Sequence, residues 1–322
     1  MSITRCIHRG KHLSGEKIAL SFAGRQTSYG ELYEEVARCA GSLVKLDPSE
    51  VGSVGILSLN CDRAIIGFYG ALWAGKVPNY LNIRWSVFEL GASVDDFAPT
   101  ILLVDKVFLE TGLELKARCS SVEHVILLDE QENLPAGVLS YADLIADAAP
   151  ISDQSVGEHE MAFLNYTGGT TGKGKGVIHS HATHAAAMAL CVAEGFFQRG
   201  NTLLVMPLFH IGGIGVTNSA LMLGNTLYIL PAFDPLGVLQ TLQDQSIEQA
   251  LLVPTMWQML LTHPRFGEFD LSAFKYLRYG ASPIDETLLM DLKAALPWVD
   301  FMQIYGQTEG CLLYTSDAAD ED

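Results

Sequence analysis

The chain has 322 residues, of which 49% are hydrophobic and 9% aromatic. This composition supports a large packed core, and the length fits one large domain or two ordinary ones. Twenty basic residues stand against 37 acidic ones, so the net charge is −17. Such a chain repels nucleic acid and anionic membranes in bulk, and any polyanionic ligand would need local positive groups.

Cysteine usage and hydropathy indicate a cytoplasmic protein without integral membrane association. Six cysteines are scattered without a C-x-x-C pair, which favours reduced thiols over a disulfide framework. No segment has the roughly 18 uninterrupted apolar residues of a membrane span. The longest apolar stretch, Ala64 to Val77, is interrupted by Lys76 and predicts a buried helix. Met1 to Leu13 lacks the apolar core of a secretory signal.

Local signals predict helices in the first hundred residues. Ser28 and Glu31 form an S-x-x-E capping box ahead of apolar residues at helical spacing. Ser86 and Glu89 form a second capping box, whose helix should end before Pro99.

Short apolar runs predict strands between the helices. Asn60 follows one such run and is expected to cap a helix that extends through Ala74. Strands alternating with helices predict an α/β layered fold with largely parallel sheets and flanking helices. The predicted strands are Val54–Leu59, Ile101–Val104, His124–Leu128, Met161–Leu164, Leu203–Met206, Thr226–Leu230, Ala250–Val253 and Phe301–Ile304.

A glycine-rich segment follows the predicted strand Met161–Leu164. Residues 166–176 read Y-T-G-G-T-T-G-K-G-K-G. Glycines let the backbone approach an anion, hydroxyls donate hydrogen bonds, and lysine supplies a mobile charge. A bland surface loop can also be rich in Gly and Thr, but two lysines at this spacing favour a polyphosphate-binding loop.

The segment does not fit a P-loop. Gly169 and Gly174-Lys175 satisfy G-x-x-x-x-G-K, yet Gly176 stands where a hydroxyl should hold Mg²⁺. The residues that follow, Val177 and Ile178, are β-branched and do not predict the helix that a P-loop needs.

The segment resembles the phosphate loop T-S-G-T-T-G-x-P-K-G of the adenylate-forming superfamily, which includes acyl-CoA synthetases, luciferases and peptide-synthetase adenylation domains. Gly168 replaces the usual Ser and removes a hydroxyl donor, while Gly174 replaces the usual Pro and loosens the loop. Both changes leave the backbone donors in place. The matching residues are Thr167, Gly169, Thr170, Thr171, Gly172, Lys175 and Gly176.

A second segment, residues 305–309, resembles the family's Y-G-x-T-E. The resemblance implies that Tyr305 stacks on adenine, that Thr308 reaches the α-phosphate and that Glu309 ligates Mg²⁺. An aromatic face for a base and a hard oxygen for a hard cation are sensible chemistry by themselves. Gly306 and Gln307 belong to the same nucleotide-binding segment.

Two further segments lie between these in the family's order. In Pro207–His210 the resemblance implies that His210 orients the acid, although a lone histidine beside apolar residues is usually a core residue. Gly280, Ala281 and Ser282, with Pro283 after them, resemble the adenine-binding turn. The same residues are also a good helix start, with Ser282 as cap and Pro283 at the first helical position.

The resemblance implies an enzyme that joins a small-molecule carboxylic acid to ATP with Mg²⁺, releases pyrophosphate and transfers the acyl group to CoA. His210, Thr308, Glu309 and Lys175 would be catalytic. Amino-acid-activating relatives carry Asp at the position of His210, so a substrate without an amine is expected. Residues 211–215, I-G-G-I-G, leave room for an acyl chain or allow close helix packing.

Several alternatives remain open at this stage. The stretches 81–84 and 277–283 resemble fatty-acyl-CoA synthetases, with an aryl-acid ligase as the rival. A nucleotide-binding module without chemistry, or a nonfunctional gene fragment, would also carry these motifs. His179, His181 and His184 lack an acidic or thiol partner in the sequence, so no metal site is assigned to them. Oligomeric state cannot be predicted.

The last residues break from the family pattern. Residues 311–320, C-L-L-Y-T-S-D-A-A-D, resemble the translation of a transposon-type sequencing adapter. We therefore expect residues 1–310 to be an incomplete large N-terminal AMP-binding domain, 311–322 to be a non-native tail, and the family's small C-terminal domain to be absent. Since that domain supplies a lysine and the thioester step, we expect little or no ligase activity from the chain alone.

Overall fold

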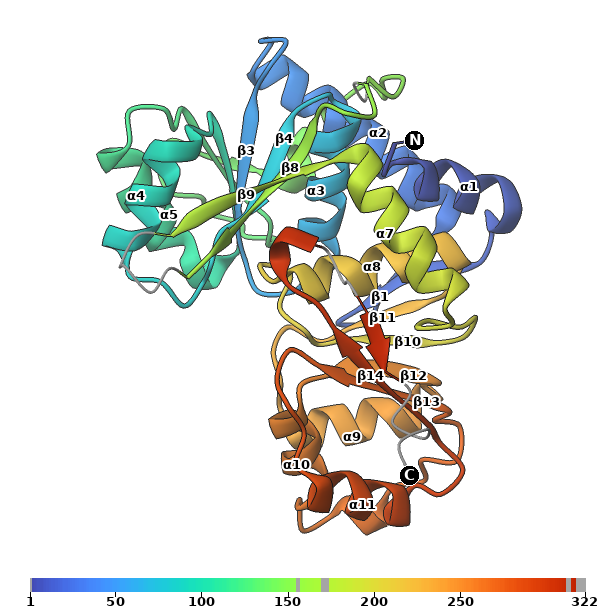
Figure 1. The fold of residues 1–322 in the computed structure, drawn as a ribbon. Coiled ribbons are helices and arrows are strands. Elements are labelled where there is room, and N and C mark those ends of the chain that lie inside the picture. The colour runs from blue at the N-terminus through green and yellow to red at the C-terminus, as the bar shows by residue number, and fades with distance from the viewer. Residues whose placement is uncertain (1, 155–156, 169–173, 311–313, 317–322) are drawn as a thin grey trace.

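The computed structural model describes residues 2–154, 157–168, 174–310 and 314–316. Two sheets separated by helices dominate the described chain (Figure 1). The larger sheet has the order β15-β14-β13-β12-β10-β11-β1-β2. Its strands are β1 (Ile18–Phe22), β2 (Arg25–Ser28), β10 (Thr202–Leu204), β11 (Leu227–Ile229), β12 (Gln249–Leu252), β13 (Tyr276–Gly280), β14 (Asp300–Tyr305) and β15 (Tyr314–Ser316).

The second sheet has the order β7-β6-β5-β3-β4-β8-β9. Neighbouring strands are parallel in both sheets except for the pairs β1–β2, β8–β9 and β14–β15. The predicted α/β architecture with largely parallel sheets is therefore confirmed. The strands are β3 (Ser53–Leu57), β4 (Val77–Tyr80), β5 (Ile101–Val104), β6 (His124–Leu127), β7 (Val138–Ser140), β8 (Met161–Thr167) and β9 (Lys175–Ser180).

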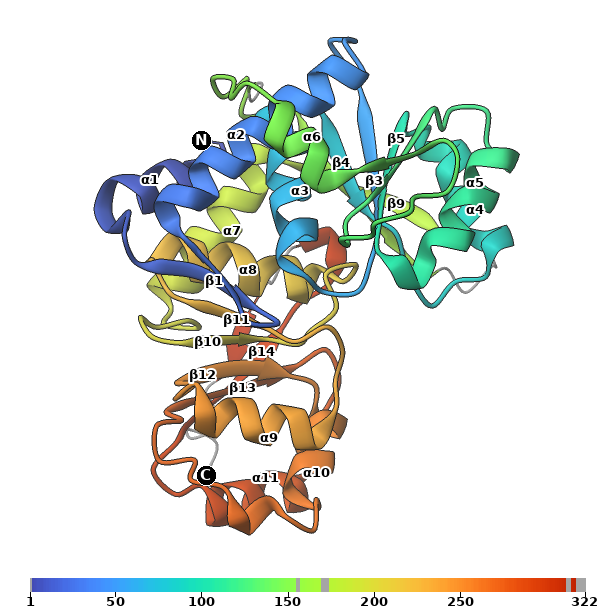
Figure 2. The same cartoon turned by 180° about the vertical axis from the view of Figure 1, so that it is seen from behind.

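Helices form three layers around the two sheets (Figures 1 and 2). A central layer lies between the sheets, α4 and α5 cover the outer face of the smaller sheet, and α9, α10 and α11 cover the outer face of the larger one. The helices are α1 (Arg5–Ser14), α2 (Tyr29–Leu46), α3 (Asp62–Trp73), α4 (Val87–Phe97), α5 (Leu109–Arg118), α6 (Tyr141–Asp147), α7 (His181–Ala193), α8 (Ile211–Leu223), α9 (Pro235–Asp244), α10 (Pro254–Leu261) and α11 (Glu286–Ala295). Short 3-10 turns are η1 (Lys106–Phe108), η2 (Phe266–Glu268) and η3 (Thr308–Gly310).

Strand β5 shows how the sequence builds these layers. Ile101 and Leu103 face the central core, whereas Leu102 and Val104 face α4 and α5. Alternate residues of a strand point to opposite faces, so a run of four apolar residues serves two cores at once. Helix α3 is enclosed on all sides and is buried along nearly its whole length, which accounts for its continuously apolar sequence.

Helix starts confirm some predictions and correct others. Both capping boxes form, at Ser28 and at Ser86. The cap of α3 is Cys61, whose sulfur accepts from the Ala64 N–H at 3.3 Å, and not Asn60. The cap of α11 is Asp285, because the helix begins three residues later than a Ser282 cap requires.

A short part of the terminal segment is described. Strand β15 lies in it and pairs antiparallel with β14. This pairing says nothing about the origin of the segment, so the boundary at residue 310 stays a prediction. Within the described parts of the chain, no helix has the length and apolar character needed to cross a membrane.

Candidate functional site

One cavity joins three of the predicted segments. It has a volume of about 320 Å³ and lies at the carboxyl ends of β12, β13 and β14, where ligands bind in open parallel sheets. Helix α8 and the residue before it form the opposite wall. The predicted site residues that line it are His210, Gly280, Ala281, Gly306, Gln307 and Thr308. Ser282 and Tyr305 are exposed outside this lining.

The glycine-rich segment begins and ends on a hairpin. Thr167, at the end of β8, lies opposite Lys175, at the start of β9, and its hydroxyl donates to the Lys175 carbonyl at 3.4 Å. The Lys175 ammonium is exposed and has no ion pair with any residue of the described ranges. Gly168 faces open space. Gly169, Thr170, Thr171 and Gly172 lie outside the described residues.

Gly174 has a packing role that the sequence did not indicate. A Cβ there would lie 2.4 Å from the Trp85 ring. The centres of the Trp85 and Tyr166 rings lie 6.3 Å apart in an edge-to-face arrangement. The glycine therefore leaves room for the indole, which would have to shift to admit a side chain, and its expected loosening of the loop stays a prediction.

The second segment reaches the same hairpin. Turn η3 lies against β9 (Figure 1), and Glu309 is close enough to His179 to influence the pKa of its imidazole. Lys175 opens the same strand four residues earlier, about 13 Å away along an extended chain. Lys175 in β9 and Glu309 in the turn that contacts β9 therefore lie beside the same strand, although neither lines the 320 Å³ cavity.

Two buried asparagines hold the backbone before His210, and the sequence did not single out either for this role. The Asn60 amide donates to the carbonyls of Met206 at 3.1 Å and Leu230 at 3.2 Å. The Asn60 oxygen accepts from the Leu208 N–H at 3.0 Å. From β8, Asn165 donates to the Phe209 carbonyl at 3.1 Å. Asn60 follows β3 and Asn165 lies in β8, so residues of the smaller sheet fix this loop, which follows β10 of the larger sheet.

Arg84 is a cation of the cavity that the sequence analysis did not assign. Its guanidinium lies 5.7 Å from the centre of the Phe209 ring and makes no ion pair with a described residue. His210 is exposed toward the cavity, yet partial desolvation of its ring lowers the pKa of the imidazole, and the nearby Arg84 charge lowers it further. The cavity therefore presents a neutral imidazole beside a permanent positive charge. In the sequence, this residue belonged only to the stretch 81–84, which resembles fatty-acyl-CoA synthetases, and no role was predicted for it.

The glycines at the start of α8 show both arrangements that the sequence left open, namely open space in the cavity and close packing. Gly212 lines the cavity, and a Cβ there would meet only the end of Met206, at 3.5 Å. Gly213 instead packs closely, since a Cβ would lie 2.3 Å from the Pro207 carbonyl oxygen.

Glu309 fits a magnesium ion on chemical grounds. Its carboxylate is exposed, and Mg²⁺ commonly takes one or two carboxylates together with phosphate oxygens and water. Across the residues that the structure describes, no group of three His, Cys, Asp or Glu side chains forms a metal-binding cluster. His179, His181 and His184 are buried, and burial lowers the pKa of each.

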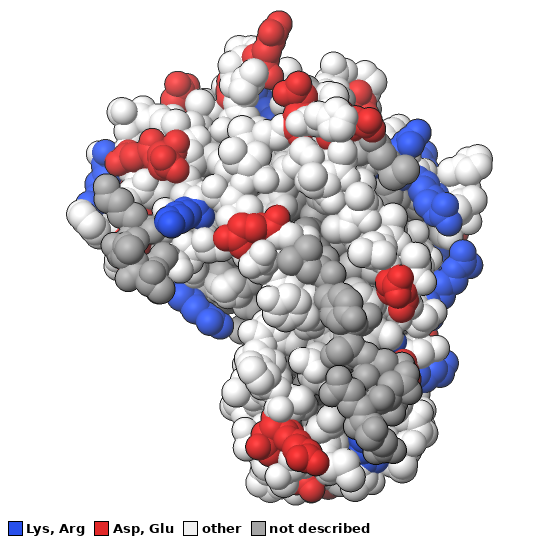
Figure 3. Space-filling model, viewed as in Figure 1, with Lys and Arg blue, Asp and Glu red and all other residues white. Residues whose placement is uncertain are grey.

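Charge is unevenly spread over the face that includes the hairpin. In Figure 3, basic residues lie along the two sides of the upper part, and acidic residues lie mostly along its top edge. Uncharged atoms cover much of the middle. A phosphate ligand would therefore depend on a few individual cations, such as Lys175 and Arg84.

The layered sheets and the cavity at their strand ends define an α/β protein with a candidate ligand site. A family model described as AMP-binding enzyme matches residues 8–322. The chain belongs to this family.

Curated relatives are acid–CoA ligases. Indoleacetate–CoA ligase of Aromatoleum aromaticum is 29% identical over 97% of this chain and 61% of its own length. Long-chain-fatty-acid–CoA ligase of Bacillus subtilis is 25% identical over 84% of this chain and 53% of its own length. The chain thus spans between half and two thirds of these relatives.

Solved structures show the same fold. The anthranilate CoA ligase AuaEII, solved with anthranoyl-AMP, matches with a TM-score of 0.93 at 21% identity. The match covers 100% of this chain and 63% of that one.

Proposed function

We propose that the protein to which these residues belong activates a carboxylic acid with ATP and passes the acyl group to CoA. In the first step a carboxylate oxygen attacks the α-phosphorus, and pyrophosphate leaves. In the second step the CoA thiol loses its proton, its sulfur attacks the acyl carbonyl, and AMP leaves. The relatives named above, all acid–CoA ligases by name, support this reaction.

The observation that carries the proposal is the shared cavity. His210, Gly280 and Thr308 come from segments separated by 70 and 28 positions, yet they line one space of about 320 Å³. Three separate segments thus meet at the carboxyl ends of parallel strands, where ligands bind in open α/β sheets. An acid and a nucleotide can lie together only where such segments meet.

Each residue has a proposed task. His210 orients the acid, Thr308 bonds the α-phosphate, and the exposed Tyr305 ring stacks on adenine. Lys175 and the glycine-rich segment hold the β- and γ-phosphates. Mg²⁺ held by Glu309 would neutralise phosphate charge.

An apolar acid without an amine fits the cavity best. Much of the lining is apolar and includes Ile211, Leu251, Val253, Met256 and Ile304. None of the described residues that line it carries a carboxylate that could pair with an amine. Arg84 would bond the anionic carboxylate or phosphate of the bound species. We favour a fatty acid, with an aryl acid as the rival, since relatives of both kinds match the chain.

The test is acid-dependent exchange of pyrophosphate into ATP by the full-length parent. We expect decanoate to support exchange more strongly than benzoate or indoleacetate. Stronger exchange with the ring acids would replace the fatty-acid proposal with the aryl-acid one. ATP binding without exchange for any acid would overturn the ligase and leave a nucleotide-binding module.

Residues 1–322 are proposed to have little or no turnover alone. The chain spans 61% of the indoleacetate ligase and 53% of the fatty-acid ligase, and this partial coverage supports the proposal. We also propose a cytoplasmic location, which is supported by the free thiols of the five described cysteines. Thioester formation by the purified chain would contradict the first of these proposals.

A further inference from the structure

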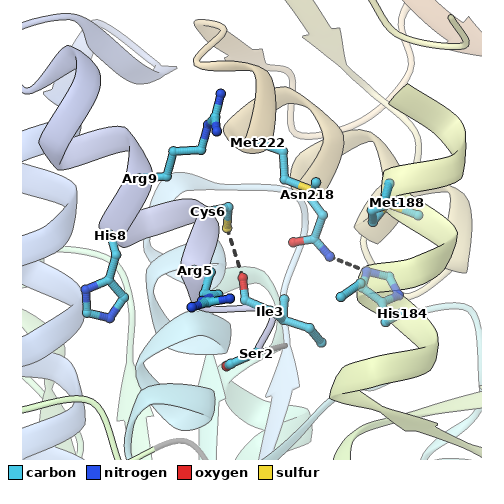
Figure 4. Close-up of a pocket in the computed structure, with 12 residues that line it drawn as sticks. Ser2, Ile3, Arg5, Cys6, His8, Arg9, His184, Met188, Asn218 and Met222 are labelled. Atoms are coloured by element: carbon cyan, nitrogen blue, oxygen red, sulfur yellow. Dashed lines mark hydrogen bonds between the residues drawn. The ribbon is translucent and has the colours of Figure 1, made fainter. Parts of the chain in front are cut away.

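A second cavity lies between α1, α7 and α8 (Figure 4). Its volume is about 540 Å³, and it shares no lining residue with the cavity at His210. Ligand pockets commonly occupy 300–1,000 Å³, so this space is large enough for a small molecule. Nothing in the reaction proposed above uses it.

The walls of the second cavity are apolar. Ile3 and Met188 are 6% and 1% exposed, and Ala185 and Met222 line the space beside them. Methionine side chains are flexible and adapt to the shape of an apolar ligand. These walls would therefore accept a hydrocarbon chain.

The polar groups in these walls are already bonded to protein. Asn218 of α8 bonds His184 of α7 and accepts from the Tyr69 hydroxyl of α3. The Cys6 thiol donates to the Ile3 carbonyl at 3.2 Å. Burial of an apolar chain here would leave none of these groups without its partner, so the usual penalty for covering a polar group is avoided.

Two arginines project from α1 at the edge of this cavity. Arg5 and Arg9 lie one helical turn apart and are both exposed, and their side chains point in different directions (Figure 4). Neither guanidinium makes a hydrogen bond or ion pair with a described residue. Lys11 on the same helix, by contrast, pairs with Glu34 at 2.8 Å. In a chain of net charge −17, two unpaired cations beside an apolar cavity suit an anionic ligand.

We propose that this cavity binds a single-chain apolar carboxylic acid. Its hydrocarbon chain lies between α1, α7 and α8, and its carboxylate pairs with either of the two arginines at the edge, Arg5 or Arg9. Guanidinium groups match carboxylates in a two-point geometry. The site is separate from the proposed catalytic one and does not depend on the ligase reaction.

The test is calorimetric titration of the full chain with decanoate below its micelle concentration. A Gly212→Leu background fills the cavity at His210, where a Cβ has room, so that binding there does not contribute. We expect one saturable equivalent in this background. Met188→Trp should abolish the binding, whereas Leu190→Trp on the exposed side of the same helix should preserve it.

The charged head is tested separately. Arg5→Gln with Arg9→Gln should weaken decanoate binding at least tenfold and leave 1-decanol binding unchanged. Lys11→Gln serves as the control on the same helix and should change neither. Because both arginines are exposed, this variant should fold even if Met188→Trp does not.

Three results would each overturn the proposal. One is loss of all decanoate binding in the Gly212→Leu background, which would leave only the site at His210. Another is wild-type affinity in the double-arginine variant. The third is equal affinity for decanoate, 1-decanol and decyltrimethylammonium, which would indicate an apolar surface without head-group recognition.

Discussion

Gly280 at the end of β13 lies directly against the carbonyl of Ile304 in β14. The two residues are partners in the parallel register, and a Cβ at position 280 would lie 2.1 Å from the Ile304 oxygen. The turn that carries Ala281 and the segment that carries Thr308 follow these two residues. Their close approach therefore sets the width of the candidate site.

Gly280→Ala should destabilise the protein and disturb the cavity. The strands must separate to accept the methyl group, and overpacking of this kind costs about 1–3 kcal/mol. Gly212→Ala is the matched control, because that Cβ would lie 3.5 Å from the nearest atom, the end of Met206. Urea denaturation of both variants measures the difference. Equal stability of the two variants would show that the strands yield freely at position 280.

The asparagine supports of the His210 segment give a second prediction. Asn60→Ala removes three hydrogen bonds and leaves buried backbone groups without partners, so we expect a loss of about 3 kcal/mol. Asn165→Ala removes one bond and should cost about 1–2 kcal/mol. Exposed Asn133→Ala is the control. The comparison is again by urea denaturation, and an Asn60 variant as stable as the control would exclude the supporting role.

The sequence predicted the elements whose signals are local. Both capping boxes formed, and the four residues predicted for β5 are the observed strand. The predicted caps at Asn60 and Ser282 were wrong. Each side chain is a suitable cap, but the observed helices begin after Cys61 and Asp285. The Asn60 amide instead bonds carbonyls that are distant in sequence. Residue spacing along the chain cannot predict such tertiary contacts.

The candidate site shows the same limit. The turns at Gly280 and Thr308 were recognisable because each is a contiguous pattern, and the structure places both in one cavity. Arg84 joins them from a loop before α4, through a tertiary contact with Phe209. The addition of the β1–β2 hairpin to the larger sheet through β11 likewise depends on a pairing some two hundred residues apart in sequence.

Arg84 should bind an anionic ligand and influence His210 at the same time. Arg84→Gln removes a charged hydrogen-bond donor, so we expect affinity for a non-hydrolysable acyl-adenylate analogue to fall about 10- to 100-fold. The pKa of His210 should rise towards its ordinary value, because one cause of its lowering is removed. Calorimetry and an NMR titration of the imidazole measure the two effects.

Two further variants separate charge from geometry at position 84. Arg84→Lys should keep the pKa of His210 low but recover only part of the affinity, since an ammonium lacks the planar pair of donors. Arg118→Gln, at an exposed pair with Glu114, should change neither quantity. An Arg84→Gln variant with unchanged affinity and an unchanged His210 titration would remove Arg84 from the site.

Acid should destabilise the fold through His184. Burial lowers the pKa of this imidazole from 6.5 to about 3, with repulsion from His179 and His181 as lesser causes. The folded state therefore keeps the ring neutral while the unfolded chain takes up a proton near pH 6.5. Since the unfolded state binds more protons in this window, stability falls as pH drops from about 6.5 towards 3, by about 1.4 kcal/mol per pH unit for this group.

His184→Gln should lower stability at pH 7 but flatten its decline on acidification. Glutamine can still bond Asn218, the hydrogen-bond partner of His184, yet it takes up no proton. His179 and His181 remain in the variant and contribute equally to both proteins. The measurement is urea denaturation at pH 7.0 and 5.0, with His159→Gln as control because that ring is 86% exposed. Between these pH values the variant should lose about 2 kcal/mol less than the wild type. If it loses as much as the wild type, the acid sensitivity arises elsewhere in the fold.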